Sequence, residues 1–439
     1  MTTVPALSGT NLPASDDAFG KRVLRKVAWR LIPLLALLYI FNILDRVNVG
    51  FAALTMQKDL EMSEEIFDFG YGLFYVGYIL FEVPSNLLLR RFGARKLIAR
   101  ILIGWGLVSC ATMFIRGAVD FYLIRILLGV AEAGFFPGII LYLTYWFPAR
   151  ERARMVAFFM TAIAFATVMG NPLSGAIMKY MADVGGLKNW QWLFLLEGLP
   201  SVVLGAIVLF VLTDRPEQAR WLTPEERDWL ARRLGQEERD IQQQHGADRL
   251  RALFEDKRVW LLICLYFTVA VGANAFGAYL PRLLKVSFPS YNLFEIGLLG
   301  SLPSLCAVLG MTLLGTHSDR TGERVGHVAI AAFVAAVGWA LAALNLSPVL
   351  SLAGLCLALM GMMSMLPVFW TLPSTFLTGA AAAGGIALIN SVGNIGGILG
   401  ASILGRFGLW AMAGILFSGV VLTAFVRPKK LISEVTNHA

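Results

Sequence analysis

The sequence predicts an all-α membrane protein with twelve transmembrane helices in two pseudo-symmetric six-helix bundles. Hydrophobic residues make up 57% of the 439 residues and charged residues 15%, with a mean hydropathy of +0.68. Soluble domains carry about 25% charged residues, so a soluble core could not absorb this much apolar sequence. Twelve apolar stretches approach the length of about 20 residues that a helix needs to cross a bilayer. Two similar loops half a chain apart complete the pattern.

The apolar stretches divide into two sets of six around one long polar insertion. They run approximately over 31–52, 69–89, 97–115, 121–146, 155–177, 191–213, 259–281, 293–315, 327–346, 349–371, 382–404 and 408–426. The predicted domains are a tail (1–30), the amino-terminal bundle (31–213), a linker (214–258), the carboxy-terminal bundle (259–426) and a second tail (427–439). Within the linker, Thr223 followed by Pro-Glu-Glu is a good helix start and predicts a surface helix.

The basic residues predict the orientation in the membrane. When loops are assigned alternately to two sides, one side holds 28 of the 37 Lys and Arg residues and the other holds 7; Arg46 and Arg125 lie within spans. The richer side includes both tails and the linker. Cytoplasmic loops carry the excess of basic residues, so we expect both termini and the linker in the cytoplasm.

Two loops repeat at matched positions. Gly93, after the second span, and Gly322, after the eighth, are 229 residues apart, which is what duplicated six-helix units would give. Glycine permits a left-handed turn, an aspartate can cap the next helix, and arginines can tie helix ends to carboxylates. We therefore expect a gating or loop role for Arg91, Gly93, Arg95, Asp319, Arg320, Gly322 and Arg324.

Four ionisable residues lie deep within predicted spans. Asp45 and Arg46 are adjacent in the first span, and Arg125 and Glu132 lie seven residues apart in the fourth, on one helix face. Each costs about 2.5–3.5 kcal/mol at the centre of a bilayer. Adjacent residues point about 100° apart on a helix, so this pair must face protein or a watered cavity. The pattern indicates a pathway for protons and a charged solute.

Each of the four has a predicted role and an alternative. Asp45 and Glu132 are the candidates for proton coupling, because a carboxyl changes its protonation with its surroundings. Arg46 and Arg125 are the candidates for binding a substrate carboxylate, because guanidinium offers a permanently charged fork. The alternative for Asp45 is that it takes part in a structural ion pair between the bundles. The alternative for Glu132 is that it serves as a static partner of Arg125.

Other polar and aromatic residues within spans are candidates for lining the substrate cavity, with helix packing as the alternative. Tyrosine and tryptophan offer an apolar wall with one donor, and amides offer both donor and acceptor. The candidates are Tyr78, Trp370, Asn390, Ser391 and Asn394. Glu82 and Glu197 lie near predicted span ends and are interpreted as anchors between helices or loops.

Sequence motifs resemble those of the major facilitator superfamily. Gly315 to Arg324 matches its Gly-x-x-x-Asp-Arg-x-Gly-x-Arg loop in full, whereas the first copy has Asn86 and Arg90 in place of the leading Gly and the Asp. Further motifs resemble the anion:cation symporter branch. They are LDRVN (44–48), PSN (84–86), RILLGVAEAGFFPG (125–138), YWFP (145–148), RAR (152–154), GNPLSG (170–175) and WLFLLEGLP (192–200). The resemblance covers roughly residues 25–400.

The resemblance implies a fold and a transport activity. Members of this branch carry organic anions such as tartrate, galactonate, phthalate, hydroxyphenylacetate or nicotinate into bacteria with protons. They use the arginine at the position of Arg46 for substrate, and the acids at Asp45 and Glu132 for protons. The chain departs from the family between spans 11 and 12, where Gly397 to Gly408 leaves almost no loop.

The predicted function is proton symport of a small organic anion by alternating access, with a preference for a tartrate-like hydroxy acid. An aromatic carboxylate, or an exchanger or facilitator on the same fold, stays open. We expect a monomer in the lipid bilayer of the bacterial cytoplasmic (inner) membrane, with protons and the anion as partners and no nucleic acid. An enzyme would need a nucleophile–base or metal constellation, which the sequence does not offer. No cofactor or metal is expected.

Overall fold

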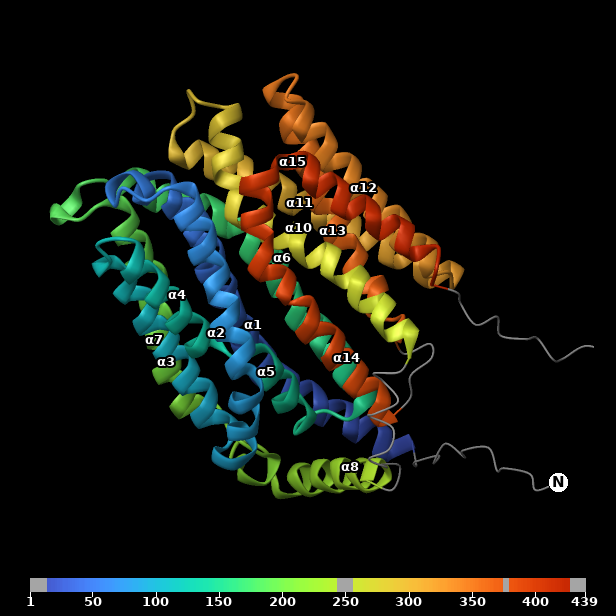
Figure 1. Ribbon diagram of the computed structural model, residues 1–439. Coiled ribbons are helices and arrows are strands. Elements are labelled where there is room, and N and C mark those ends of the chain that lie inside the picture. Colours follow the sequence, from blue (N-terminus) through green and yellow to red (C-terminus); the bar gives the residue numbers. More distant parts are fainter. Residues whose placement is uncertain (1–13, 243–255, 374–378, 427–439) are drawn as a thin grey trace, which may run out of the picture.

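The computed structural model describes residues 14–242, 256–373 and 379–426. Figure 1 shows two groups of long helices side by side, with one further helix lying across their lower end. The first group contains α1 (Ala14–Asp59), α2 (Glu64–Phe92), α3 (Ala94–Ala111), α4 (Ala118–Glu132), α5 (Phe135–Thr144), α6 (Ala149–Tyr180) and α7 (Asn189–Val211). The second contains α10 (Lys257–Ser287), α11 (Leu293–Thr321), α12 (Val325–Leu344), α13 (Pro348–Phe369), α14 (Gly379–Gly393) and α15 (Ile395–Thr423).

The helices account for the predicted twelve crossings. Ten helical stretches of the described chain are long and apolar enough to span a membrane, and α4 with α5 forms one of them. The 29-residue α2, which carries more charge, supplies another. The last stretch, Leu388–Thr423, contains two arms, because Gly408 (φ 72°, ψ −174°) interrupts α15. A positive φ with extended ψ is open to glycine alone, so one residue replaces the loop between spans 11 and 12.

Close backbone contact between α2 and α4 positions the charged residues of α4. A Cβ atom at Gly129 would lie 2.0 Å from the carbonyl oxygen of Phe74, and one at Gly77 would lie 2.4 Å from that of Ile126. Small residues allow membrane helices to approach this closely. Arg125 and Glu132, one turn on either side of Gly129, are thereby held against α2.

The two bundles meet where α6 of the first crosses α11 of the second. The Asn171 side-chain amide donates to the carbonyl oxygen of Gly300 at 2.9 Å, and the Ser301 hydroxyl donates to that of Val168 at 2.7 Å. These residues lie in the second half of α6 and the first half of α11. The contact is therefore at the end of the molecule remote from the lower helix in Figure 1.

A second contact between the bundles lies at the same end. The Tyr279 hydroxyl of α10 donates to both carboxylate oxygens of Asp68 on α2 at 2.7 Å. One turn away, the Arg282 guanidinium lies 3.3 Å from the Glu64 carboxylate. A tyrosine bond and an ion pair thus hold α10 against the first turns of α2.

The lower helix is α8 (Pro224–Gln242), which begins where the sequence predicts it. Thr223 and Glu226 form a reciprocal cap: the Thr223 amide donates to Glu226 Oε2 at 2.9 Å, and the Glu226 amide donates to Thr223 Oγ1 at 3.2 Å. The Lys26 ammonium of α1 donates to the same carboxylate at 2.7 Å. One carboxylate therefore both caps α8 and attaches it to α1.

This attachment is expected to weaken in acid. Burial acts to raise the pKa of Glu226, but the bonds from Lys26 and Thr223 outweigh it and hold the pKa below the ordinary value. The stabilisation is therefore complete above the unfolded value of about 4.3 and is lost as the pH falls through the lower folded value. Lys26 is 42% exposed, so its pair contributes about 0.2–1 kcal/mol.

Hydrogen exchange of the α8 amides at pH 7 and pH 3.5 measures this loss. When exchange is expressed as protection relative to the intrinsic rate at each pH, Glu226→Gln should show lower protection already at pH 7 and little further change at pH 3.5. Glu225→Gln, at an exposed position of the same turn, serves as the control and should behave like the wild type. Equal exchange in wild type and Glu226→Gln at pH 7 would rule out the attachment.

Candidate functional site

Asp45 points into the interior of the first bundle. Its carboxylate accepts hydrogen bonds from the Ser109 hydroxyl at 2.8 Å, from the Asn48 amide at 3.2 Å and from the Trp105 indole N–H. Asp45 is 2% exposed, and among the described residues it forms no salt bridge. Three donors supply the stabilisation that an ion-pair partner would otherwise give. The alternative of an ion pair between the bundles is therefore wrong for this conformation.

Arg46 points away from Asp45 and forms an ion pair with Glu132. Its Nε donates to Glu132 Oε1 at 2.6 Å. Glu132 is 1% exposed, whereas 32% of the Arg46 side chain is accessible. The guanidinium also lies over the rings of Phe74 and Tyr78, at 5.5 and 5.3 Å from their centroids. The alternative that made Glu132 the partner of Arg125 is thus wrong, because the carboxylate binds across to α1.

Arg125 lies beneath this pair and is almost enclosed. Its guanidinium donates to the Tyr71 carbonyl oxygen at 3.3 Å and lies 5.2 and 5.0 Å from the ring centroids of Tyr71 and Phe74. Its Nε has no hydrogen-bond partner, and the residue is 4% exposed. Arg125 therefore retains an unused donor directed into the site.

An aromatic stripe on α2 forms the wall around both guanidinium groups. Tyr71, Phe74, Tyr75 and Tyr78 are spaced i, i+3, i+4 and i+7, so they share one helix face. Only Tyr78 was a sequence candidate, although the spacing was visible in the sequence. The Tyr75 hydroxyl also donates to Asn274 Oδ1 of α10, which links the stripe to the other bundle.

A small polar cavity lies at the centre of this arrangement. It is lined by Asp45, Arg46, Tyr71, Phe74, Tyr75, Arg125 and Leu128, and it encloses about 10 Å³. This is room for about one water molecule. An organic anion can therefore reach both arginines only when side chains or helices around the cavity move apart.

Two of the candidates from the second bundle, Asn390 and Trp370, contact Tyr266 of α10. Its hydroxyl donates to Asn390 Oδ1 at 3.4 Å, and its ring centroid lies 5.0 Å from that of Trp370. Ser391 follows Asn390 on α14, and Asn394 precedes the first residue of α15. The structure brings Trp370 and Asn390 together at Tyr266, which the sequence analysis did not single out; their role in lining the substrate cavity stays a prediction.

The first repeated loop ties α3 to the residues that follow α7. Gly93 adopts φ +87°, and the Arg95 amide donates to Asp214 Oδ1 at 2.7 Å. The Arg95 guanidinium lies 4.0 Å from the same carboxylate. The side chain of Arg91 lies outside the described part of the chain.

The second loop uses a different acid from the one expected. Gly322 adopts φ +69°, and Asp319 accepts from the Arg324 guanidinium at 2.7 Å. The expected capping of α12 by Asp319 is wrong, since Glu323 Oε1 accepts from the Gly326 amide at 2.6 Å instead. Arg320 is exposed.

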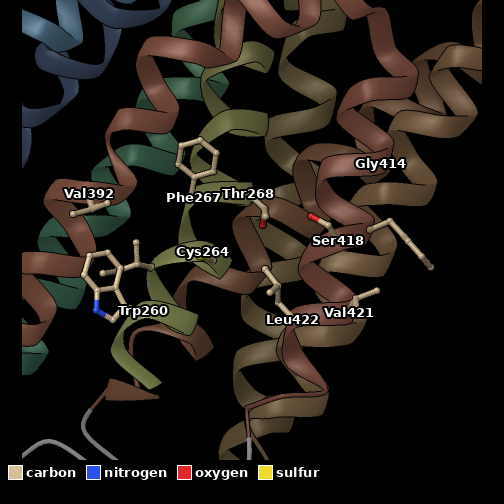
Figure 2. Close-up of a pocket in the computed structure, with 11 residues that line it drawn as sticks. Trp260, Cys264, Phe267, Thr268, Val392, Gly414, Ser418, Val421 and Leu422 are labelled. Atoms are coloured by element: carbon tan, nitrogen blue, oxygen red, sulfur yellow. The ribbon is translucent and has the colours of Figure 1, made fainter. Parts of the chain in front are cut away.

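A larger hollow of about 800 Å³ lies between α10, α14 and the second arm of α15 (Figure 2). Trp260, Phe417 and Val421 in its lining are 44–51% exposed. The hydroxyls of Thr268 and Ser418 donate to carbonyls of their own helices. Because its lining contains no charged residue and much exposed apolar surface, this hollow suits lipid chains and not an anion.

Glu197 is buried deeper than a position near a span end would allow, although its bond to α6 agrees with the predicted anchor between helices. It lies in the middle of α7, is 1% exposed and accepts from the Ser174 hydroxyl of α6 at 2.8 Å. An anchor near a helix end would be partly solvated. Glu82 is likewise buried, at 8% exposure, in the second half of α2.

Apolar helices in two bundles, with charged residues buried between them, define a multi-pass membrane transporter. The family model described as Major Facilitator Superfamily matches residues 35–401, and the chain belongs to this family. A putative tartrate transporter from Agrobacterium vitis is 46% identical, over 95% of this chain and 94% of its own length. The putative metabolite transport protein NicT from Pseudomonas putida is 40% identical, over 98% and 100%.

Solved structures of the same fold support this assignment. The crystal structure of a D-xylose-proton symporter superposes with a TM-score of 0.73 at 15% identity, covering 92% of this chain and 98% of that one. Such a likeness at low identity concerns the fold alone. The resemblance found from the motifs is confirmed at the level of the family.

Proposed function

We propose that the protein imports a small organic anion together with protons across the bacterial inner membrane, by alternating access. A putative tartrate transporter and NicT, among its relatives, support an organic substrate. Two arginines directed into one small polar cavity support an anion, because guanidinium binds carboxylate through two parallel hydrogen bonds.

The observation that carries the proposal is the ion pair between Arg46 and Glu132. A substrate carboxylate and the Glu132 carboxylate compete for the same guanidinium, which lies at hydrogen-bond distance from Glu132. Protonation of Glu132 removes its charge and frees Arg46 for the anion. Binding of the anion and binding of a proton thus favour each other, which is the requirement for symport.

The contacts between the bundles support an inward-facing state. The Asn171–Gly300 and Tyr279–Asp68 bonds close the end remote from α8. With the termini and α8 on the cytoplasmic side, as the basic residues predict, the closed end is the outer one. The anion would then leave towards the cytoplasm, and import requires the outer contacts to open.

A compact hydroxy acid of the tartrate type is the preferred substrate. Tyr75 lines the cavity together with both arginines, and Tyr266 with Asn390 offers further hydroxyl and amide groups in the second bundle, which suits a hydroxylated carboxylate. The rings of Phe74 and Trp370 favour the second candidate, an aromatic carboxylate. An exchanger on the same fold would use the arginines without a need for proton binding.

Uptake of labelled tartrate into proteoliposomes tests the proposal. An inward proton gradient should drive accumulation, and a protonophore should abolish it. Unlabelled phthalate and nicotinate, added as competitors, report on the aromatic alternative. Uptake that is unchanged after the gradient is dissipated would exclude symport and favour the exchanger.

Asp45→Asn is expected to abolish accumulation while preserving exchange of preloaded substrate. The amide keeps the size and one acceptor oxygen, which can serve Ser109 and Asn48, while its NH2 group replaces the oxygen that accepts from Trp105; it cannot gain or lose a proton. The control is Asp59→Asn on the same helix, whose acceptor role towards the Trp190 indole an amide can fill. Wild-type accumulation by Asp45→Asn would remove Asp45 from proton coupling.

A further inference from the structure

Glu197 and Asp45 lie close together in the first bundle with one amide between them. The Asn48 side chain donates to Asp45 at 3.2 Å and also faces Glu197. All three side chains are at most 2% exposed. The Asn48 Oδ1 atom is buried without a hydrogen-bond partner.

The two carboxyls have unequal surroundings. Asp45 accepts three hydrogen bonds, which stabilise its ionised form. Glu197 accepts one, from Ser174, and its Oε2 has no partner. An ionised carboxylate in such a place is costly, whereas a protonated one has a donor to offer.

No positive charge among the described residues compensates Glu197. The titratable group that faces it is Asp45 of α1, and α6 contributes the Ser174 hydroxyl. Within the described residues no arginine or lysine forms a salt bridge with it, since Arg46 is directed to Glu132. Two negative charges that are both buried away from solvent repel each other, so ionisation of one carboxyl disfavours ionisation of the other.

We propose that Glu197 is a second proton-binding residue of the transport cycle, forming with Asp45 a buried pair that carries at most one negative charge. The proposal rests on the proposed proton coupling. In the present conformation Glu197 holds the proton and Asp45 the charge. Asp45 lines the small polar cavity, whereas Glu197 does not, so Glu197 affects the driving force and not substrate recognition.

Infrared spectroscopy and transport together test this proposal. The purified protein should show the carbonyl band of a protonated carboxylic acid that Glu197→Gln removes. Under a gradient of one pH unit, each coupled proton raises equilibrium accumulation about tenfold. Glu197→Gln should therefore accumulate about tenfold less substrate than the wild type, with exchange unchanged.

Two further variants separate proton binding from packing. Glutamine has the size of glutamate, whereas aspartate is one methylene shorter but keeps the carboxyl. A proton site predicts better accumulation by Glu197→Asp than by Glu197→Gln, and a packing role predicts the reverse. Ser201→Ala, at a fully buried position one turn along α7, is the control. It should match the wild type.

The outcomes distinguish the two proposals. An unchanged infrared band, or wild-type accumulation by Glu197→Gln, overturns the role of Glu197 while symport stands. Absence of proton-driven accumulation in the wild type itself overturns symport, and the role of Glu197 in the cycle falls with it. Loss of the band together with recovery by Glu197→Asp supports both.

Discussion

Arg46→Ala is expected to destabilise the protein by about 3–5 kcal/mol, because it leaves the carboxylate of Glu132 buried and unpaired. Glu132 is 1% exposed, and among the described residues its salt-bridge partner is Arg46. The large value reflects the buried charge left behind and not the net contribution of the pair. Thermal unfolding in detergent, with the variants compared under one condition, measures the loss.

The double variant Arg46→Ala/Glu132→Gln should recover most of this stability. Glutamine at residue 132 carries no charge, so the loss of Arg46 no longer leaves a buried charge unpaired. The changes in unfolding free energy of the two single variants are therefore strongly non-additive. Additive losses would show that the two side chains do not depend on each other. Arg125→Ala serves as the comparison. The Arg125 guanidinium packs over the Phe74 ring, donates to the Tyr71 carbonyl oxygen and has no carboxylate partner among the described residues, so its removal leaves no carboxylate unpaired.

The same pair should govern anion binding. Arg46→Lys keeps the charge beside Glu132 but loses the planar fork, and hydrogen bonds to charged groups contribute about 1.5–3 kcal/mol. Tartrate affinity should therefore fall about 10- to 100-fold while thermal stability changes less than in Arg46→Ala. Glu132→Gln, which frees the guanidinium, should bind tartrate more tightly at neutral pH and with less pH dependence than the wild type. Unchanged affinity in Arg46→Lys would remove Arg46 from the site.

The fold could be predicted because the bilayer restricts it. Backbone groups in lipid must bond within their own segment, so apolar stretches of sufficient length become helices. The almost absent loop before the last span was also visible in the sequence. Its conformation, a kink at Gly408 inside α15, required the structure.

The partners of the buried charges could not be predicted, because helix periodicity relates residues on one helix only. Arg125 and Glu132 share a face of α4, which suggested that they form a pair. The close approach of α2 and α4 instead places Arg125 against the aromatic stripe, and Glu132 reaches Arg46 on α1. The burial of Glu197 was missed for a similar reason, since only the packing of α6 and α1 against α7 reveals it.

Gly297→Leu is expected to prevent closure of the outer end. A Cβ atom at Gly297 would lie 2.4 Å from the carbonyl oxygen of Asn171 and 3.1 Å from Cα of Pro172, so backbone and not a flexible side chain is in the way. Overpacking of this kind costs about 1–3 kcal/mol, and about 1.4 kcal/mol changes the ratio of two conformations tenfold. Because the contact joins the two bundles, the cost falls on the closed state and not on the fold of either bundle.

Spin labels at Glu61 and Ser290, near the ends of the two bundles that lie remote from α8, measure the effect as a distance distribution. Gly297→Leu should shift the distribution to longer distances and reduce uptake to below about a tenth, since transport requires both states. Gly104→Leu on α3, where nothing lies within 4 Å of an added Cβ, is the control and should leave both unchanged. A wild-type distribution in Gly297→Leu would show that the contact between α6 and α11 does not hold the outer end closed.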